Sequence, residues 1–151
     1  MRAVVQRVNN ANVNINGENI SDIEKGLLIF LGVADGDTEN DLNYIYDKVI
    51  NLRIFEDENE KMNLSLLDIK GDILIVSQFT LCGDTRKGRR PNFTSAAKPD
   101  LANQLYEKFI EKAKSEENIN RVGTGKFGAN MKIGLVNDGP VTILLDSRKE
   151  F

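Results

Sequence analysis

The 151-residue sequence contains no histidine and only one cysteine. The absence of histidine excludes Ser-His-Asp and Cys-His catalysis, and it removes the usual general base near neutral pH and almost every common zinc site. The single cysteine, Cys82, excludes an internal disulfide and fits a reducing compartment, where we expect its side chain to pack as a small hydrophobic group. Any chemistry must therefore come from backbone amides, hydroxyls, carboxylates, lysines, a metal held by oxygen atoms, or a group on the substrate.

Long apolar runs are also missing. The longest, residues 27–31 with the following 32–34, is far short of the roughly 20 residues that a membrane-spanning helix needs. Arg2 lies where a signal peptide would have its apolar segment, so we expect a cytoplasmic protein with no membrane partner. The length, with 40% apolar and 28% charged residues, predicts one soluble globular domain spanning residues 1–151.

Alternating apolar and polar residues predict a long first strand over residues 2–16, with a bulge near Asn9 and Asn10. Asn16-Gly17 is typical of a hairpin turn, because both residues tolerate positive φ. Further strands are expected at 20–23, 26–33, 53–55, 73–76, 131–136 and 141–146, with local pairing at 63–67. Because strands outnumber helices, the sheet order should be mixed or antiparallel.

Two main helices are expected among these strands. Asp37 and Thr38 precede an acidic first turn, and the helical spacing of apolar residues continues to about Asn51. Pro99 begins a second helix that ends near Ser115. The sequence therefore predicts an α/β fold in which both helices pack on a sheet.

Polar residues follow the apolar run at 73–76, at the exit of a strand that should be buried on both faces. This polar stretch is Ser77-Gln78-Phe79-Thr80-Leu81. Polar side chains at the edge of an apolar layer are either hydrogen-bonded plugs or groups aimed at a ligand. Spacing alone favours the plug.

A basic loop comes next, with five cations and one acidic residue between positions 84 and 98 of a chain whose net charge is −3. The cations are Arg86, Lys87, Arg89, Arg90 and Lys98. Such loops are most often simply solvated, and the net charge argues against broad nonspecific binding to nucleic acid. A cluster of arginines beside Phe93, directly after the polar stretch, nevertheless suits the anchoring of a phosphate-bearing substrate.

Two glycine-containing motifs indicate loops. Residues 123–128 match G-x-G-x-x-G, but a dinucleotide site needs a helix afterwards, and Met131 and Ile133 alternate as in a strand. We therefore expect a close-packed loop there. By spacing alone, Asn137-Asp138-Gly139-Pro140 predicts a surface turn between two separate strands.

Taken together, Ser77-Gln78-Phe79-Thr80-Leu81 and Asn137-Asp138-Gly139-Pro140-Val141-Thr142 closely resemble the two signature motifs of bacterial-type D-aminoacyl-tRNA deacylases. The likeness covers essentially the whole chain, including residues 1–8, 87–91 and 125–131. It implies a homodimer of small α/β subunits with a barrel-like core and active sites at the subunit interface. The implied activity is hydrolysis of the ester bond of D-aminoacyl-tRNA without a cofactor or metal, which is chiral proofreading in translation. Glycyl-tRNA mischarged on tRNA(Ala) is an expected second substrate, because glycine has no side chain to reject.

The resemblance also implies how chirality is read. Gly139-Pro140 would hold a cis peptide that enters the partner's pocket, with Arg7 keeping the motif in place. An L-amino acid would drive its side chain into the motif's carbonyls, whereas a D-amino acid presents hydrogen there. Phe127, Ala129 and Met131 are expected at the substrate as well.

The catalytic segment implied by the resemblance is Ser77, Gln78, Phe79 and Thr80. Backbone N–H groups at Phe79 and Thr80 would stabilise the tetrahedral oxyanion. No residue next to Thr80 in the sequence is an obvious base, so we expect Thr80 to position groups while water attacks and the substrate's 2′-hydroxyl assists. Ser77 and Gln78 would orient the motif, or the substrate's α-amino group and terminal adenosine, and Phe79 should pack, either in the core or as a contact. The expected tRNA contacts are Arg86, Lys87, Arg89 and Arg90.

The main alternative is a noncatalytic homodimeric RNA-binding module. In that case the basic loop would bind RNA and the polar strand end would be a structural plug. A DNA-associated role is a third possibility, for which the acidic composition offers no support.

Overall fold

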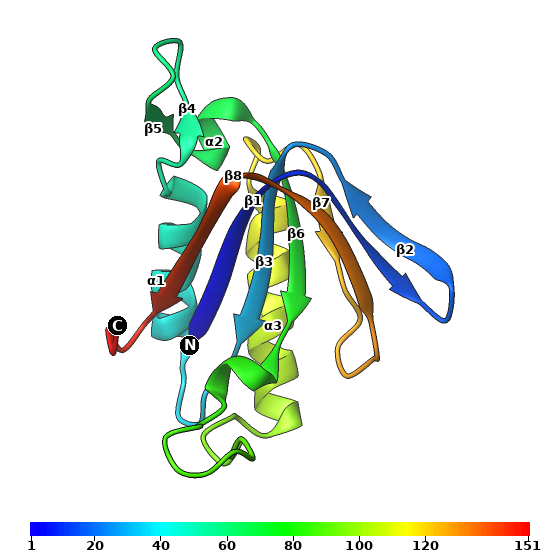
Figure 1. The fold of residues 1–151 in the computed structure, drawn as a ribbon, viewed down its shortest axis with the longest axis vertical. Coiled ribbons are helices and arrows are strands. Elements are labelled where there is room, and N and C mark those ends of the chain that lie inside the picture. Colours follow the sequence, from blue (N-terminus) through cyan, green and yellow to red (C-terminus); the bar gives the residue numbers. More distant parts are fainter.

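A computed structural model describes all residues 1–151, and its sheet is organised around two long strands that bend together (Figure 1). β1 (Arg2–Ile15) pairs antiparallel with β8 (Lys132–Asp146) along nearly its whole length. The pairing is irregular between Gln6 and Asn10, and there both strands turn to form an inverted V. The bulge expected near Asn9 and Asn10 is confirmed, and it explains the bend, because an extra residue kinks a strand.

The remaining strands of this sheet are β2 (Glu18–Ile23), β3 (Gly26–Gly32), β6 (Asp72–Ser77) and β7 (Val122–Thr124). One limb of β1 pairs antiparallel with β3 and the other with β2, while β3, β6 and β7 are mutually parallel. β7 then lies beside β2, where the Thr124 N–H donates to the Ser21 hydroxyl at 3.1 Å. The sheet is therefore mixed and nearly closes into a barrel, as expected.

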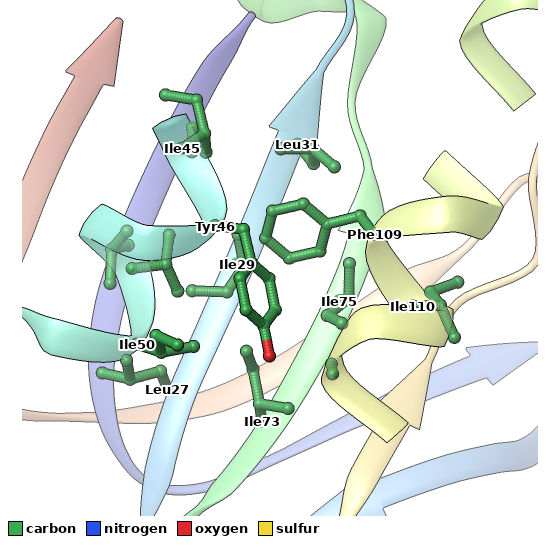
Figure 2. Close-up of a cluster of buried hydrophobic side chains, with 14 of the residues drawn as sticks. Leu27, Ile29, Leu31, Ile45, Tyr46, Ile50, Ile73, Ile75, Phe109 and Ile110 are labelled. Carbon is green, nitrogen blue, oxygen red and sulfur yellow. The ribbon is translucent and has the colours of Figure 1, made fainter. Parts of the chain in front are cut away.

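Two helices, α1 (Glu39–Asn51) and α3 (Pro99–Ser115), cover one face of the sheet, and α2 (Leu66–Ile69) is a single short turn. Figure 2 shows the main core between the helices and the sheet, where alternate residues of β3 and β6 meet α1 and α3. The labelled side chains are Leu27, Ile29, Leu31, Ile45, Tyr46, Ile50, Ile73, Ile75, Phe109 and Ile110. The intervening residues Leu28, Leu74 and Val76 face a second, smaller core inside the barrel. Both faces of β6 are thus buried, which confirms the interpretation of the run at 73–76.

The two expected helix starts are confirmed. Thr38 caps α1 by accepting from the Asn40 N–H, and the Asp41 side chain accepts from the Thr38 N–H in return. Pro99 lies in the first turn of α3. The reciprocal contacts of Thr38 and Asp41 satisfy amides at the start of α1 that have no partner inside the helix. No helix in the structure has both the length and the apolar character needed to span a membrane.

The local pairing expected at 63–67 is confirmed for its first residues, because β5 (Met62–Leu64) pairs with β4 (Phe55–Glu56), whereas Ser65 then caps α2 through Asp68. Two other local expectations were wrong. The first residues of the G-x-G-x-x-G match form β7, where Gly123 packs so closely that a Cβ would lie 2.6 Å from the Ser21 hydroxyl.

The second error concerns β8. Residues 137–140 are not a turn between two strands but the bend within one continuous strand. The Asn137 side chain accepts from the Val141 N–H at 2.8 Å, so it supplies a hydrogen bond where the regular ladder is interrupted. Because β1 bends at the same level, the two strands resume pairing on the other side of the bend.

Candidate active site

The chain turns sharply where β6 ends at Ser77, and it forms a single 3₁₀ turn, η1 (Phe79–Cys82). The Gln78 N–H donates to the Leu31 carbonyl at 2.8 Å, which fixes the start of η1 on the end of β3. The first hydrogen bond of the turn runs from the Leu81 N–H to the Gln78 carbonyl, at 3.3 Å. The amides of Phe79 and Thr80 precede that bond and are not used by the turn, so their N–H groups are available to other acceptors.

A cavity of about 640 Å³ opens beside η1 and brings together most of the expected substrate residues. Ser77, Gln78 and Phe79 line one side of it. Phe127, Ala129 and Met131 line it as well, from the loop and strand that follow β7. Most lining residues are apolar, so the cavity suits a flat or apolar group with a few polar contacts at its edge.

Phe79 is not a core residue, because 57% of its surface is exposed. Its ring packs edge-on against Phe93, with centroids 5.1 Å apart, and both rings line the cavity. Gly83 makes this pair possible, since a Cβ at that position would lie 2.9 Å from the Phe93 ring. The aromatic pair therefore forms a wall of the site beside the basic loop.

Thr80 is exposed on η1 and is not among the residues that line the cavity. Its hydroxyl accepts from the Gln78 side-chain amide at 2.5 Å and contacts no acidic or basic side chain. A hydroxyl with an amide as its only side-chain partner has no group to take its proton. The geometry therefore favours a positioning role for Thr80 over a nucleophilic one.

Helix α3 contributes a wall of the cavity that was not predicted from the sequence. Pro99, Ala102 and Tyr106 line the cavity at helical spacing, and that spacing was the only signal available. The Tyr106 hydroxyl donates to the Ile75 carbonyl at 2.8 Å, and its ring packs against Phe127 at 6.0 Å. Burial raises the pKa of Tyr106 well above its ordinary value, so this hydroxyl stays protonated and acts as a structural donor.

Gly139 and Pro140 lie elsewhere, at the bend of β8, where both residues are exposed and their peptide bond is cis. Arg7, only 5% exposed, donates to the Asp138 carbonyl at 3.0 Å and to the Ile54 carbonyl at 2.6 Å. The Asp138 carboxylate lies 3.4 Å from Arg7 Nε and completes the contact. Arg7 thus holds the segment just before Gly139, as the resemblance implies.

The structure does not bring this bend to the cavity of the same chain. Arg7 pairs with Leu27 at the start of β3, whereas the cavity is lined by Leu31, four residues further along. At about 3.3 Å per residue this is a separation of roughly 13 Å along the strand. Figure 1 shows the bend at the upper end of the sheet and η1 at the lower end.

Within the basic loop, Arg86 is already paired. It makes a two-pronged contact with Asp84, with nitrogen to oxygen distances of 2.9 and 2.7 Å, and Asp84 also accepts from the Arg86 N–H. Lys87, Arg89 and Arg90 are exposed. The positive charge that the loop presents to a ligand therefore comes mainly from these three residues.

The Asp84 contact predicts an unusual titration. The hydrogen bonds from Arg86 lower the pKa of Asp84 from its ordinary 3.8 to about 2. Because the folded pKa is depressed, the contact is fully formed above pH 3.8 and should be lost as the pH falls through about 2. We expect the carboxyl carbon signal of Asp84 to show an NMR titration midpoint near pH 2, and Arg86→Ala to return it toward 3.8. A midpoint near 3.8 in the unmodified chain would contradict the contact.

Cys82 packs as expected. It is buried, and its thiol donates to the Val33 carbonyl at 3.6 Å. Burial raises the pKa of the thiol, so it remains protonated near neutral pH and is a poor nucleophile.

The fold and the site define a small α/β protein with a nearly closed barrel and an open apolar cavity beside an exposed 3₁₀ turn. Residues 4–146 match the family model described as D-Tyr-tRNA(Tyr) deacylase. The chain is 64% identical to the D-aminoacyl-tRNA deacylase of Thermosipho melanesiensis and 60% identical to that of Clostridioides difficile. Each alignment covers the full length of this chain and of the relative. The chain therefore belongs to the D-Tyr-tRNA(Tyr) deacylase family of hydrolases, which confirms the resemblance found in the sequence.

Solved structures give the same fold. The c-Myc DNA unwinding element binding protein is 42% identical, with a TM-score of 0.91, over 97% of this chain and 98% of that one. A probable eukaryotic D-amino acid tRNA deacylase superposes with a TM-score of 0.77 over 96% of this chain and 98% of that one. Because its sequence is only 23% identical, this second structure shows similarity of fold alone.

Proposed function

We propose that this chain hydrolyses the ester bond of D-aminoacyl-tRNA and releases the free D-amino acid and tRNA. In this reaction water attacks the ester carbonyl, the bond to the terminal ribose breaks, and the ribose hydroxyl leaves with a proton. The observation that carries the proposal is that the Phe79 and Thr80 amides lie outside the hydrogen bonding of η1, whose first residue, Phe79, lines the cavity. Family membership supports the same reaction.

The amides of Phe79 and Thr80 would stabilise the oxyanion that forms when water adds to the ester. Each such donor is worth roughly 10² to 10³ in rate. Water is the nucleophile, with the substrate's 2′-hydroxyl assisting, since the Thr80 hydroxyl contacts only the Gln78 amide. Ser77 and Gln78 orient the α-amino group and the terminal adenosine, whose flat base suits the apolar cavity between Phe79 and Phe127. This chemistry requires no histidine, cofactor or metal.

Chiral selection in this proposal comes from a second subunit. Gly139-Pro140 is exposed and lies at the end of the sheet opposite the cavity, so it can act on a substrate only in the cavity of another chain. A homodimer would place each motif in the partner's cavity, with its carbonyls facing the substrate α-carbon. A glycyl ester, which carries only hydrogen there, would also be accepted.

An apolar row that is half-buried at Val4 and Phe30 and exposed at Leu144 supports the homodimer. Val4 pairs with Phe30 on one side and with Leu144 on the other, so the three side chains point to the same face of the sheet. That face lies opposite the helices, and Leu144 is 58% exposed. Apolar side chains from three adjacent strands would be buried if a second copy packed on this face.

The basic loop would bind the tRNA backbone. Because Asp84 already pairs with Arg86, we expect Arg89→Ala and Arg90→Ala each to weaken tRNA binding more than Arg86→Ala does. Each lost phosphate contact should also reduce the salt dependence of log Kd by about 0.7 to 0.9. Binding titrations at several salt concentrations would measure both effects, and an Arg86→Ala loss larger than the other two would contradict this arrangement. A tRNA substrate fits the cytoplasmic location expected from the sequence.

The proposal is tested with D-tyrosyl-tRNA and L-tyrosyl-tRNA in parallel, with a chelator present. We expect release of D-tyrosine and little release of L-tyrosine. Equal rates on both substrates would overturn the chiral assignment. Salt-dependent tRNA binding without any deacylation would instead favour the noncatalytic RNA-binding module.

A further inference from the structure

Side chains outside the active-site cavity hold the carboxyl end of η1. Arg2 Nη1 donates to the Leu81 carbonyl at 3.1 Å, and the Ser95 hydroxyl donates to the Cys82 carbonyl at 2.6 Å. The last carbonyls of a helical turn otherwise have no partner. Both anchors therefore fix η1 by its final carbonyls, at the opposite end from the Phe79 amide.

η1 also separates two cavities. The second cavity, about 660 Å³, is more polar than the first and is lined by Arg2, Cys82 and Ser95. Phe79 lines the first cavity and not the second. A side chain that acts from the second cavity can set the orientation of η1 without touching a substrate in the first.

Arg2 is itself held in place. Its Nε lies 3.3 Å from a carboxylate oxygen of Asp146, whose side chain is only 2% exposed, and Nη2 lies 2.5 Å from the Glu150 carboxylate. The other Asp146 oxygen accepts from the Arg148 N–H at 2.8 Å. Three different guanidinium nitrogens thus contact Leu81, Asp146 and Glu150. This forked contact ties the end of β8 to η1, and the single ammonium of a lysine cannot reproduce it.

We propose that Arg2 is a positioning residue for the deacylation reaction. By fixing the Leu81 carbonyl, it sets the tilt of η1 and hence the direction of the Phe79 and Thr80 N–H groups. η1 is a single turn, so a shift at its carboxyl end is transmitted directly to its first amides. A misplacement of about 1 Å at a reacting centre can cost up to about 10² in rate. This role rests on the proposed function, in which those amides stabilise the oxyanion.

The test compares Arg2→Met and Arg2→Lys with Arg148→Met. The control removes contacts to Asp37 and to the Asp35 carbonyl from the same terminal segment, but Arg148 makes no hydrogen bond to η1. We expect Arg2→Met to lower kcat on D-tyrosyl-tRNA about tenfold with KM changed less than about twofold, because the substrate contacts are kept and the amides are misaligned. Arg2→Lys should recover only part of the loss, and Arg148→Met should leave kcat unchanged.

A second readout does not depend on activity. In amide NMR spectra, the Phe79 and Thr80 signals should move in Arg2→Met and stay in place in Arg148→Met. Melting curves give the folded fraction for both variants, and if Arg2→Met does not fold, Arg2→Lys and Ser95→Ala carry the same comparison. Unchanged kcat and unchanged η1 signals in Arg2→Met would overturn the positioning role. An unmodified chain that hydrolyses no D-tyrosyl-tRNA would instead overturn the proposed function, and the η1 signals would still decide whether Arg2 orients the turn.

Discussion

Gly139→Ala is expected to abolish most of the discrimination between D- and L-tyrosyl-tRNA, by raising the relative rate on the L substrate about 100-fold. Gly139 has φ +133°, a region that side chains rarely adopt. A Cβ there would lie 2.8 Å from Val141 Cγ2 and 3.1 Å from Arg7 Nη2. The bend of β8 must therefore move, and the proposed rejection of L-amino acids depends on where its carbonyls lie. The ratio of single-turnover rates on the two substrates measures the effect.

Gly17→Ala is the matched control for this substitution. Gly17 also has a left-handed φ, +83°, but it lies in the turn between β1 and β2 with no atom within 4 Å of an added Cβ. It should incur a similar backbone penalty while leaving the rate ratio unchanged. An unchanged ratio in Gly139→Ala, with the fold intact, would show that the bend does not read chirality.

Arg7→Met is expected to cause both a loss of stability and a loss of chiral selection. The methionine keeps much of the packing of the buried stem, but the carbonyls of Ile54 and Asp138 lose their donor. Leaving a buried acceptor without a partner costs about 1–3 kcal/mol, so we expect a loss of about 2–4 kcal/mol in the free energy of unfolding. In a domain of this size that corresponds to a fall in Tm of roughly 5 to 15 °C. Thermal and urea unfolding would measure it.

Arg121→Met is a suitable control for Arg7→Met. Arg121 pairs with Asp22 at 3.1 Å, but both side chains are more than half exposed, and such a pair contributes little. We expect near-native stability and an unchanged D to L rate ratio in this variant. If Arg7→Met lowers Tm but keeps the D to L rate ratio at a temperature where the variant is folded, Arg7 stabilises the fold and has no role in chiral selection.

The sequence predicted the elements whose signals are local. The caps of α1, the buried run at 73–76 and the bulge in β1 all depend on nearby residues, and the structure confirms them. β7 was missed because it has only three residues, including a glycine, and is defined by its parallel partner β6, far away in the sequence. We predicted two strands in place of β8 because the residues at its bend, 137–140, have the composition of a turn. The continuity of the strand depends on its partner β1, which bends at the same level.

The site was predicted unevenly for the same reason. The stretch at 77–80 stands out as polar residues after an apolar strand, and the cavity confirms that three of them meet Phe127, Ala129 and Met131. Spacing alone could not show that these residues line a cavity, because one wall of that cavity comes from the distant helix α3. In the proposed mechanism the roles of Gly139 and Pro140 depend on a second chain, and no pattern within one sequence encodes where that chain would lie.

The unused amides at the start of η1 have a genetic consequence. In the proposed mechanism the groups that stabilise the oxyanion belong to the backbone, and every amino acid except proline supplies them. Most codon changes at positions 79 and 80 would therefore leave the essential N–H groups in place, and their effects would reflect altered shape. Proline is the one replacement that removes the N–H group. In a saturation library, the proline variants at these two positions should therefore have much lower deacylation activity than the other variants.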